Sequence, residues 1–164
     1  MNCPACGNVL EEITIGDVVV NVCQGGCGGI WFDNFELEKF DEPRESAGEE
    51  LLDIERDESI VVDRTKRLNC PKCDGIVMMR HFFSVKRQVE VDECPACGGF
   101  WLDAGELAGI RAQFASSQER DKATDEYFDG LFGEELTQMR AQSEERAQKA
   151  GRIARMFRFI CPTY

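Results

Sequence analysis

The residues of this chain that could do chemistry are its cysteines, and eight of the nine fall into four short pairs. Three pairs have two residues between the cysteines, whereas Cys23 and Cys27 have three. A pair at this spacing supplies two thiolates from one tight turn, and two such turns complete the four-sulfur tetrahedron that a metal ion requires. Thioredoxin-like pairs or free buried thiols are the alternative, but four pairs in tandem favour metal ligation.

The order of the pairs predicts two metal sites, one in each half of the cysteine-bearing region. We expect the first two pairs to hold one ion and the last two pairs to hold another, because each set flanks one predicted hairpin. The predicted ligands are Cys3, Cys6, Cys23 and Cys27 in site 1, and Cys70, Cys73, Cys94 and Cys97 in site 2. The extra residue between Cys23 and Cys27 is expected to form a glycine bulge or to weaken site 1, so that a chelator strips site 1 first.

The two cysteine sets belong to an internal repeat. A Cys-Pro-x-Cys turn opens each copy, and a second cysteine pair then leads into Gly-Gly, an apolar residue, Trp, an apolar residue and Asp, followed by Glu-Leu. Residues 9–15 and 18–22 are predicted strands around a Gly16-Asp17 turn, and residues 76–83 and 88–92 are their counterparts. The expected fold is therefore small α+β, with two four-cysteine ribbons, each followed by a helix.

The composition divides the chain into four segments. We predict ribbon 1 at residues 1–40, an acidic and partly helical linker at 41–67, ribbon 2 at 68–112 and a helical C-terminal tail at 113–164. The linker helix is expected to begin at a capping box over Ser46 to Glu49. Helix breaks are expected near Ser116-Ser117 and at Gly130 to Gly133, because glycine is a poor helix former.

The two copies resemble the transcription factor IIB-type zinc ribbon family of small bacterial proteins. The pattern of that family is Cys-Pro-x-Cys, a hairpin, and then Cys-x-x-Cys-Gly-Gly-h-Trp-h-Asp-x-Gly-Glu-Leu, where h is apolar. Residues 94–107 match this ending at every position, and residues 23–37 match it apart from the extra residue and Phe35, which replaces a glycine. The resemblance implies structural zinc, two ions per chain, and an association with transcription or nucleic acid.

The tryptophans and the acidic residues of the repeat have structural interpretations. Trp31 and Trp101 are expected to be core residues that cover the metal sites. Each is followed by an Asp and, three residues later, a Glu, which is the spacing of a capping box at a helix start. These acidic pairs are Asp33 with Glu36 and Asp103 with Glu106. Because no nucleophile with a paired base and no open metal position is visible, we predict that the chain is not an enzyme.

The net charge and the tail limit the possible partners. The formal charge of −12 opposes binding to a phosphate backbone, so a nucleic-acid contact needs a local basic patch. Residues 140–158 offer one, with six basic and two acidic side chains. The basic residues are Arg140, Arg146, Lys149, Arg152, Arg155 and Arg158. A helix predicted over residues 134–160 could pair with a second copy, bind a protein partner, contact nucleic acid or lie on a membrane surface.

These observations predict a non-enzymatic zinc protein that binds a protein partner in transcription or another nucleic-acid process. Two alternatives stay open: a rubredoxin-like iron electron carrier, since Cys-Pro-x-Cys-Gly turns also hold iron, and a membrane-peripheral adaptor acting through the tail. The sequence opens with neither a basic stretch nor an apolar one, so we expect a cytoplasmic protein with reduced cysteines. Cys161, the remaining cysteine, is expected to be a free or partly buried thiol.

Overall fold

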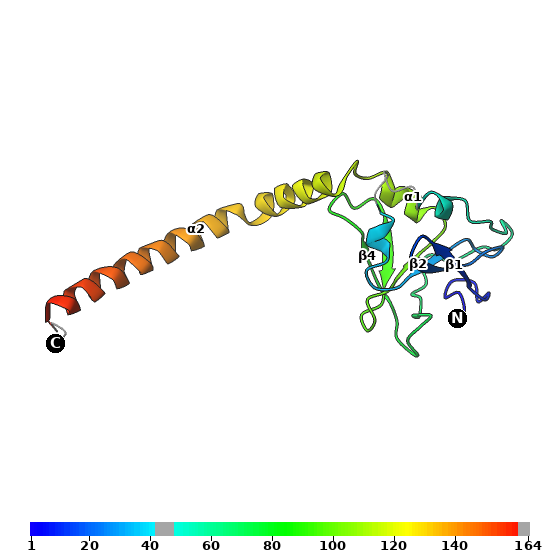
Figure 1. The fold of residues 1–164 in the computed structure, drawn as a ribbon, viewed down its shortest axis with the longest axis horizontal. Helices are drawn as coiled ribbons and strands as arrows, with labels where there is room; N and C mark the ends of the chain where they lie inside the picture. The colour runs from blue at the N-terminus through cyan, green and yellow to red at the C-terminus, as the bar shows by residue number, and fades with distance from the viewer. Residues whose placement is uncertain (42–47, 161–164) are drawn as a thin grey trace. The chain divides into compact units, whose positions relative to one another are not determined.

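The computed structural model describes the backbone of residues 1–41 and 48–160 (Figure 1). It describes the side chains of these residues as far as Ile153. The chain forms two compact units that meet between Lys122 and Ala123. The first unit, residues 1–122, holds both cysteine repeats and is called the ribbon unit below. The predicted capping box over Ser46 to Glu49 lies partly outside the described residues, and Cys161 lies wholly outside them.

Six short strands form one antiparallel sheet in the ribbon unit, and each repeat contributes three of them. The strands are β1 (Glu11–Ile15), β2 (Val18–Val22), β3 (Ile30–Phe32), β4 (Met79–Phe82), β5 (Glu90–Glu93) and β6 (Phe100–Leu102). Their order across the sheet is β1-β2-β3-β6-β5-β4, so the second repeat follows the first in reversed order. The two repeats therefore meet along one seam, where β3 lies against β6.

The two predicted hairpins are confirmed. Strands β1 and β2 pair in a register that leaves Gly16 and Asp17 as a two-residue turn. Gly16 has a φ of +62°, the left-handed backbone that this turn requires at its first central position and that glycine adopts without strain. Strands β4 and β5 pair with a longer turn between them, as the looser sequence of that region predicts.

The seam between the repeats is not predicted from the sequence. Strands β3 and β6 pair antiparallel, with Trp31 directly opposite Trp101. Each strand has only three residues, so a period-two pattern is too short to be recognised there. Because of this pairing, the two ribbons are halves of one continuous sheet.

Side chains alternate along the seam strands, which separates the buried residues into two clusters. Ile30, Phe32 and Leu102 belong to an apolar core together with residues of the short helices. Trp31 and Trp101, which point to the opposite side, belong to a second cluster that contains the metal-site cysteines. The sheet thus has an apolar core on one face and both candidate metal sites on the other.

The helices agree with the predictions in part. Helix α1 (Glu106–Arg111) follows Asp103 as predicted, but the equivalent segment of repeat 1 forms only a 3₁₀ turn, η1 (Leu37–Lys39). The described part of the linker contains the 3₁₀ turn η3 (Glu50–Leu52). In the parts of the chain that the structure describes, no helix has the length and apolar content that crossing a membrane requires.

Helix α2 (Ser117–Ile160) is longer than predicted. It begins at the expected break near Ser117, but it continues through Gly130 and Gly133, so the break predicted there is wrong. A glycine weakens a helix by about 1 kcal/mol relative to alanine. Unlike proline, glycine keeps its N–H group and does not clash with the preceding turn. The helix-forming residues on either side therefore keep this segment helical.

Candidate metal centres

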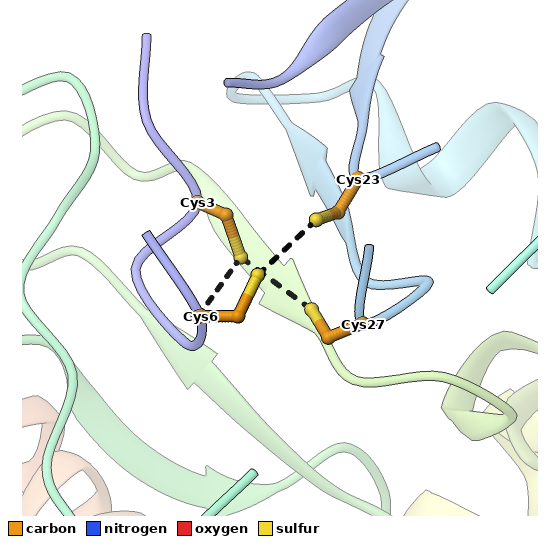
Figure 2. A group of neighbouring side chains, drawn as sticks. All are labelled: Cys3, Cys6, Cys23 and Cys27. Carbon is orange, nitrogen blue, oxygen red and sulfur yellow. Dashed lines mark hydrogen bonds between the residues drawn. The ribbon is translucent and has the colours of Figure 1, made fainter. Parts of the chain in front are cut away.

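The structure brings the eight predicted cysteines together in two groups of four. In each group the sulfur atoms all lie within 4.8 Å of one another. Figure 2 shows site 1, where Cys3 and Cys6 face Cys23 and Cys27 across the space between two turns. Each group contains only cysteines of one repeat, which is the grouping expected from the sequence.

The distances within the groups fit a tetrahedral four-thiolate site. When each sulfur lies about 2.3 Å from a metal ion, a regular tetrahedron places the sulfurs about 3.8 Å apart. The Sγ atoms of Cys3 and Cys27 are 3.5 Å apart in site 1, and those of Cys70 and Cys97 are 3.9 Å apart in site 2. Four sulfur donors suit zinc or iron, and they fill the coordination of a tetrahedral ion.

Backbone amides within the first turn of each site donate to the first sulfur of that turn. The N–H of Cys6 donates to Sγ of Cys3 at 3.4 Å, and the N–H of Cys73 donates to Sγ of Cys70 at 3.2 Å. A hydrogen bond of this kind favours the thiolate, which is the form that binds a metal. The turns are therefore organised for ligation by their own backbone.

The crowded sulfurs differ in their pKa values. The hydrogen bond between Cys3 and Cys27 is the largest cause of shifts in both, lowering the pKa of Cys3 to about 5 and raising the pKa of Cys27. Burial raises the pKa of Cys23 to about 12. In site 2, burial acts to raise the pKa of Cys94, but hydrogen bonds from two backbone amides and with two neighbouring cysteine side chains together outweigh it and lower the value to about 7. Some of these thiols keep their protons unless a cation joins them, so metal binding must release protons.

The extra residue in site 1 forms a bulge that the linker covers. Gly25 has a left-handed φ of +61° and its N–H donates to the carbonyl oxygen of Glu55 at 2.8 Å. The neighbouring Gly26 forms a short parallel bridge with the same linker segment. Cys27 is buried, whereas Cys97 at the equivalent place in site 2 is only partly buried. The bulge is accommodated without opening site 1, so the structure gives reason to expect that site 2, and not site 1, loses its metal first.

The Trp-x-Asp-x-x-Glu motif forms a hydrogen-bonded brace in both repeats. The indole Nε1 of Trp31 donates to Oδ1 of Asp33 at 3.1 Å, and the backbone N–H of Asp33 donates to Oε2 of Glu36 at 2.7 Å. The second repeat makes the same two bonds, at 3.0 and 2.8 Å. Half of the predicted capping box is therefore present, because the Glu caps the Asp amide while the Asp side chain holds the indole instead of a helix end.

Each tryptophan fills a space that a glycine of the other repeat leaves open. A Cβ atom on Gly29 would lie 2.2 Å from Cζ2 of Trp101, and one on Gly99 would lie 2.2 Å from Cζ2 of Trp31. Both indoles are completely buried, which confirms the predicted core role of the tryptophans. The role of these glycines was not predicted from the sequence, although the repeated Gly-Gly-x-Trp spacing carries the signal.

Phe35 departs from the pattern of the second repeat and has a strained backbone. Its φ is +67°, and the equivalent Gly105 has a φ of +88°. A residue with a Cβ loses about 1–2 kcal/mol in this conformation. The Phe35 side chain is 69% exposed, so its burial does not offset the strain. It lines a groove of about 340 Å³ together with Leu37, Phe83 and Phe100.

A comparison with protein families identifies the class of this protein. The sequence pattern of the family described as transcription factor zinc-finger matches residues 2–42 and 69–112, which together are more than half of the chain. The chain belongs to this family and carries tandem zinc ribbons of the transcription factor IIB type. Its two four-cysteine groups suit two metal ions, and zinc is inferred from the family. No curated protein and no solved structure matches the chain.

Proposed function

We propose that this chain is a non-enzymatic zinc protein that acts in transcription or another nucleic-acid process by binding a protein partner through its ribbon unit. The observation that carries the proposal is the ligand set of each site, which consists of four protein thiols. Structural zinc sites have closed sets of this kind, whereas catalytic zinc sites keep one position for water or substrate. Zinc ions held by these residues would stabilise the fold.

The acidic residues of the repeats support a structural interpretation. Burial raises the pKa of Glu106 to about 7, a value that would suit a general acid or base. However, its Oε2 accepts the backbone N–H of Asp103 at 2.8 Å, and Asp103 in turn accepts the indole N–H of Trp101 at 3.0 Å. These carboxylates hold the end of the seam strand in place, which accounts for their spacing without catalysis.

The surface around Phe35 supports a protein partner. A bulky residue with a strained backbone persists where the fold or the function demands it, and Phe35 is too exposed to serve the core. The groove beside it combines apolar walls with the acidic residues Glu38 and Glu93. Its basic lining residue, Arg120, is paired with Asp41, so the charge of the groove is acidic on balance. An aromatic anchor beside an apolar pocket with a polar rim is typical of protein interfaces. We expect the partner to supply an apolar side chain flanked by basic residues.

Affinity capture with the full zinc-loaded chain tests this proposal. The variant Phe35→Gly carries the residue found at Gly105 of the second repeat, so it should fold and bind zinc while its affinity for the captured protein falls by about tenfold or more. Val61→Ala is the matched control, because Val61 is also a highly exposed apolar residue of the ribbon unit. Equal capture by wild type and Phe35→Gly, or capture of nucleic acid without a protein, would show that the proposed surface is wrong.

The identity of the metal is tested separately, because iron would make the chain an electron carrier. Elemental analysis of protein purified from its native source should give two zinc ions per chain. The same protein should show no absorption in the visible range. Iron bound by four thiolates is coloured and redox-active. Iron at full occupancy with a reversible colour change on reduction would refute the structural-zinc proposal.

A further inference from the structure

Along one side of helix α2, the order of apolar, acidic and basic residues distinguishes the two directions in which a second copy could lie. Steps of four and three residues, taken alternately, follow one side of an α-helix. From residue 128 to residue 153 these steps give Phe128, Phe132, Glu135, Met139, Gln142, Arg146, Lys149 and Ile153, which we call the α2 stripe. Apolar residues stand at both ends of the stripe, an acidic residue in its first half and two basic residues in its second half.

The apolar residues of the stripe are exposed. Phe128 and Ile153, at its two ends, are 50% and 54% exposed, and the rings of Phe128 and Phe132 stack with their centroids 6.2 Å apart. Glycines at positions 130, 133 and 151 lower the intrinsic helix stability. Because long helices in proteins depend mainly on the packing of an apolar face, this stripe is expected to be covered by a partner.

The charges of α2 are segregated along its length. Residues 123–135 contain five acidic and no basic side chains, whereas residues 140–158 contain six basic and two acidic ones. Two copies side by side in the same direction would place like charges together. Two copies in opposite directions would place the acidic part of each beside the basic part of the other, which is favourable.

We propose that α2 pairs with α2 of a second copy of this chain in an antiparallel coiled coil. In such a pair, two residues face each other when they lie the same number of positions from a common midpoint, one before it and the other after it. A midpoint between residues 140 and 141 places Phe128 opposite Ile153 of the partner subunit and Glu135 opposite Arg146 of the partner subunit. A parallel pair would instead place Glu135, Arg146 and Lys149 each opposite its own copy, giving three layers of like charge. Polar residues within a stripe are known to select helix direction and register in this way.

The pairing has a consequence for the whole protein. The ribbon unit precedes α2 in the chain, so an antiparallel pair carries one ribbon unit at each end. Residues 123–160 of α2 span about 57 Å at about 1.5 Å per residue. A protein with one ribbon unit at each end of the pair can bind two sites at once, which raises its overall affinity without new contacts. The pairing involves α2 alone and does not depend on what the ribbon unit binds.

Charge reversal on the stripe tests both the pairing and its direction. Sedimentation equilibrium of the full zinc-loaded chain should show a monomer–dimer equilibrium. The variants Glu135→Arg and Arg146→Glu each place like charges at both symmetry-related contacts, so each should weaken the dimer by about tenfold or more. An equimolar mixture of the two variants should regain the wild-type affinity, because both contacts then join opposite charges. Glu134→Arg and Arg140→Glu are the matched controls, since they change the same charges off the stripe and should have little effect.

Three results would overturn the proposal. The first is a wild-type chain that stays monomeric up to several hundred micromolar. The second is a loss of dimer in the control variants equal to that in the stripe variants, and the third is a mixture that fails to regain the dimer. Circular dichroism and zinc content of every variant verify that it is folded, so that a negative result counts against the pairing.

Discussion

Replacing Gly99 by alanine should disrupt the seam between the two repeats. The new Cβ would lie 2.2 Å from Cζ2 and 2.6 Å from Cη2 of Trp31, and 3.0 Å from the carbonyl oxygen of Phe32. Carbon atoms in contact are normally about 3.5–4.0 Å apart, so the ring must move by more than about 1 Å. Trp31 is completely buried and bonded through Nε1 to Asp33, so such a shift also strains that hydrogen bond.

The expected loss is at the upper end of the usual range for overpacking. Inserting a methyl group into a well-packed core costs about 1–3 kcal/mol, and we expect Gly99→Ala to lower the free energy of unfolding by about 3 kcal/mol. Gly29→Ala should cost a similar amount, because its Cβ would lie 2.2 Å from the same ring atom of Trp101. The measurement is denaturant unfolding of the zinc-loaded protein, followed by tryptophan fluorescence.

A double-mutant cycle shows whether the clash itself causes the loss. Trp31→Phe removes the ring atoms that the new methyl group meets, so Gly99→Ala should cost at least about 1 kcal/mol less in that background than in wild type. Gly130→Ala is the control, because a Cβ there meets nothing within 4 Å, and alanine in a helix should stabilise the chain by up to about 1 kcal/mol. A Gly99→Ala protein as stable as wild type, or strict additivity with Trp31→Phe, would refute the packing described for the seam.

Three further predictions concern single residues and the order of metal loss. Phe35→Gly should raise the free energy of unfolding by up to about 1 kcal/mol, because relief of the left-handed strain exceeds the added flexibility of the unfolded chain; a lower melting temperature would contradict this. The pKa of Glu106 is raised from near 4.5 to about 7, so the folded state holds more protons between these values. Stability should therefore fall by about 1–2 kcal/mol as the pH rises through this window, allowing for partial solvent screening, and Glu106→Gln should remove the slope in unfolding measured from pH 5 to 8. During slow chelation, alkylation read by mass spectrometry should label Cys97 before Cys27, because Cys97 is the more exposed of the two; the reverse order would mean that the bulge weakens site 1.

Much of the metal-site architecture could be predicted from the sequence because it depends on local chemistry. A Cys-x-x-Cys spacing places two sulfurs on one turn whatever surrounds it, and the amides of the same turn stabilise the thiolates. The first hairpin follows from two segments rich in β-branched residues on either side of a glycine turn, with Gly16 in the conformation that this turn requires. The repetition of the pattern then assigned each sulfur to its own group of four, which is the grouping in the structure.

Features that depend on residues distant in the sequence were decided only by the tertiary structure. The sequence predicts Trp31 and Trp101 as core residues. It cannot show that each ring occupies the space above a glycine of the other repeat, because a cross-repeat contact has no period along the chain. The linker segment that bridges to Gly26 and covers the extra residue of site 1 is likewise distant in the sequence. The prediction of a helix break at residues 130–133 was wrong for a related reason. The cost of about 1 kcal/mol per glycine in helix propensity is small beside the cooperative stability of a long helix. The local geometry of the cysteine turns thus determined where the metal ligands lie. Packing between the two repeats determined that the repeats form one sheet.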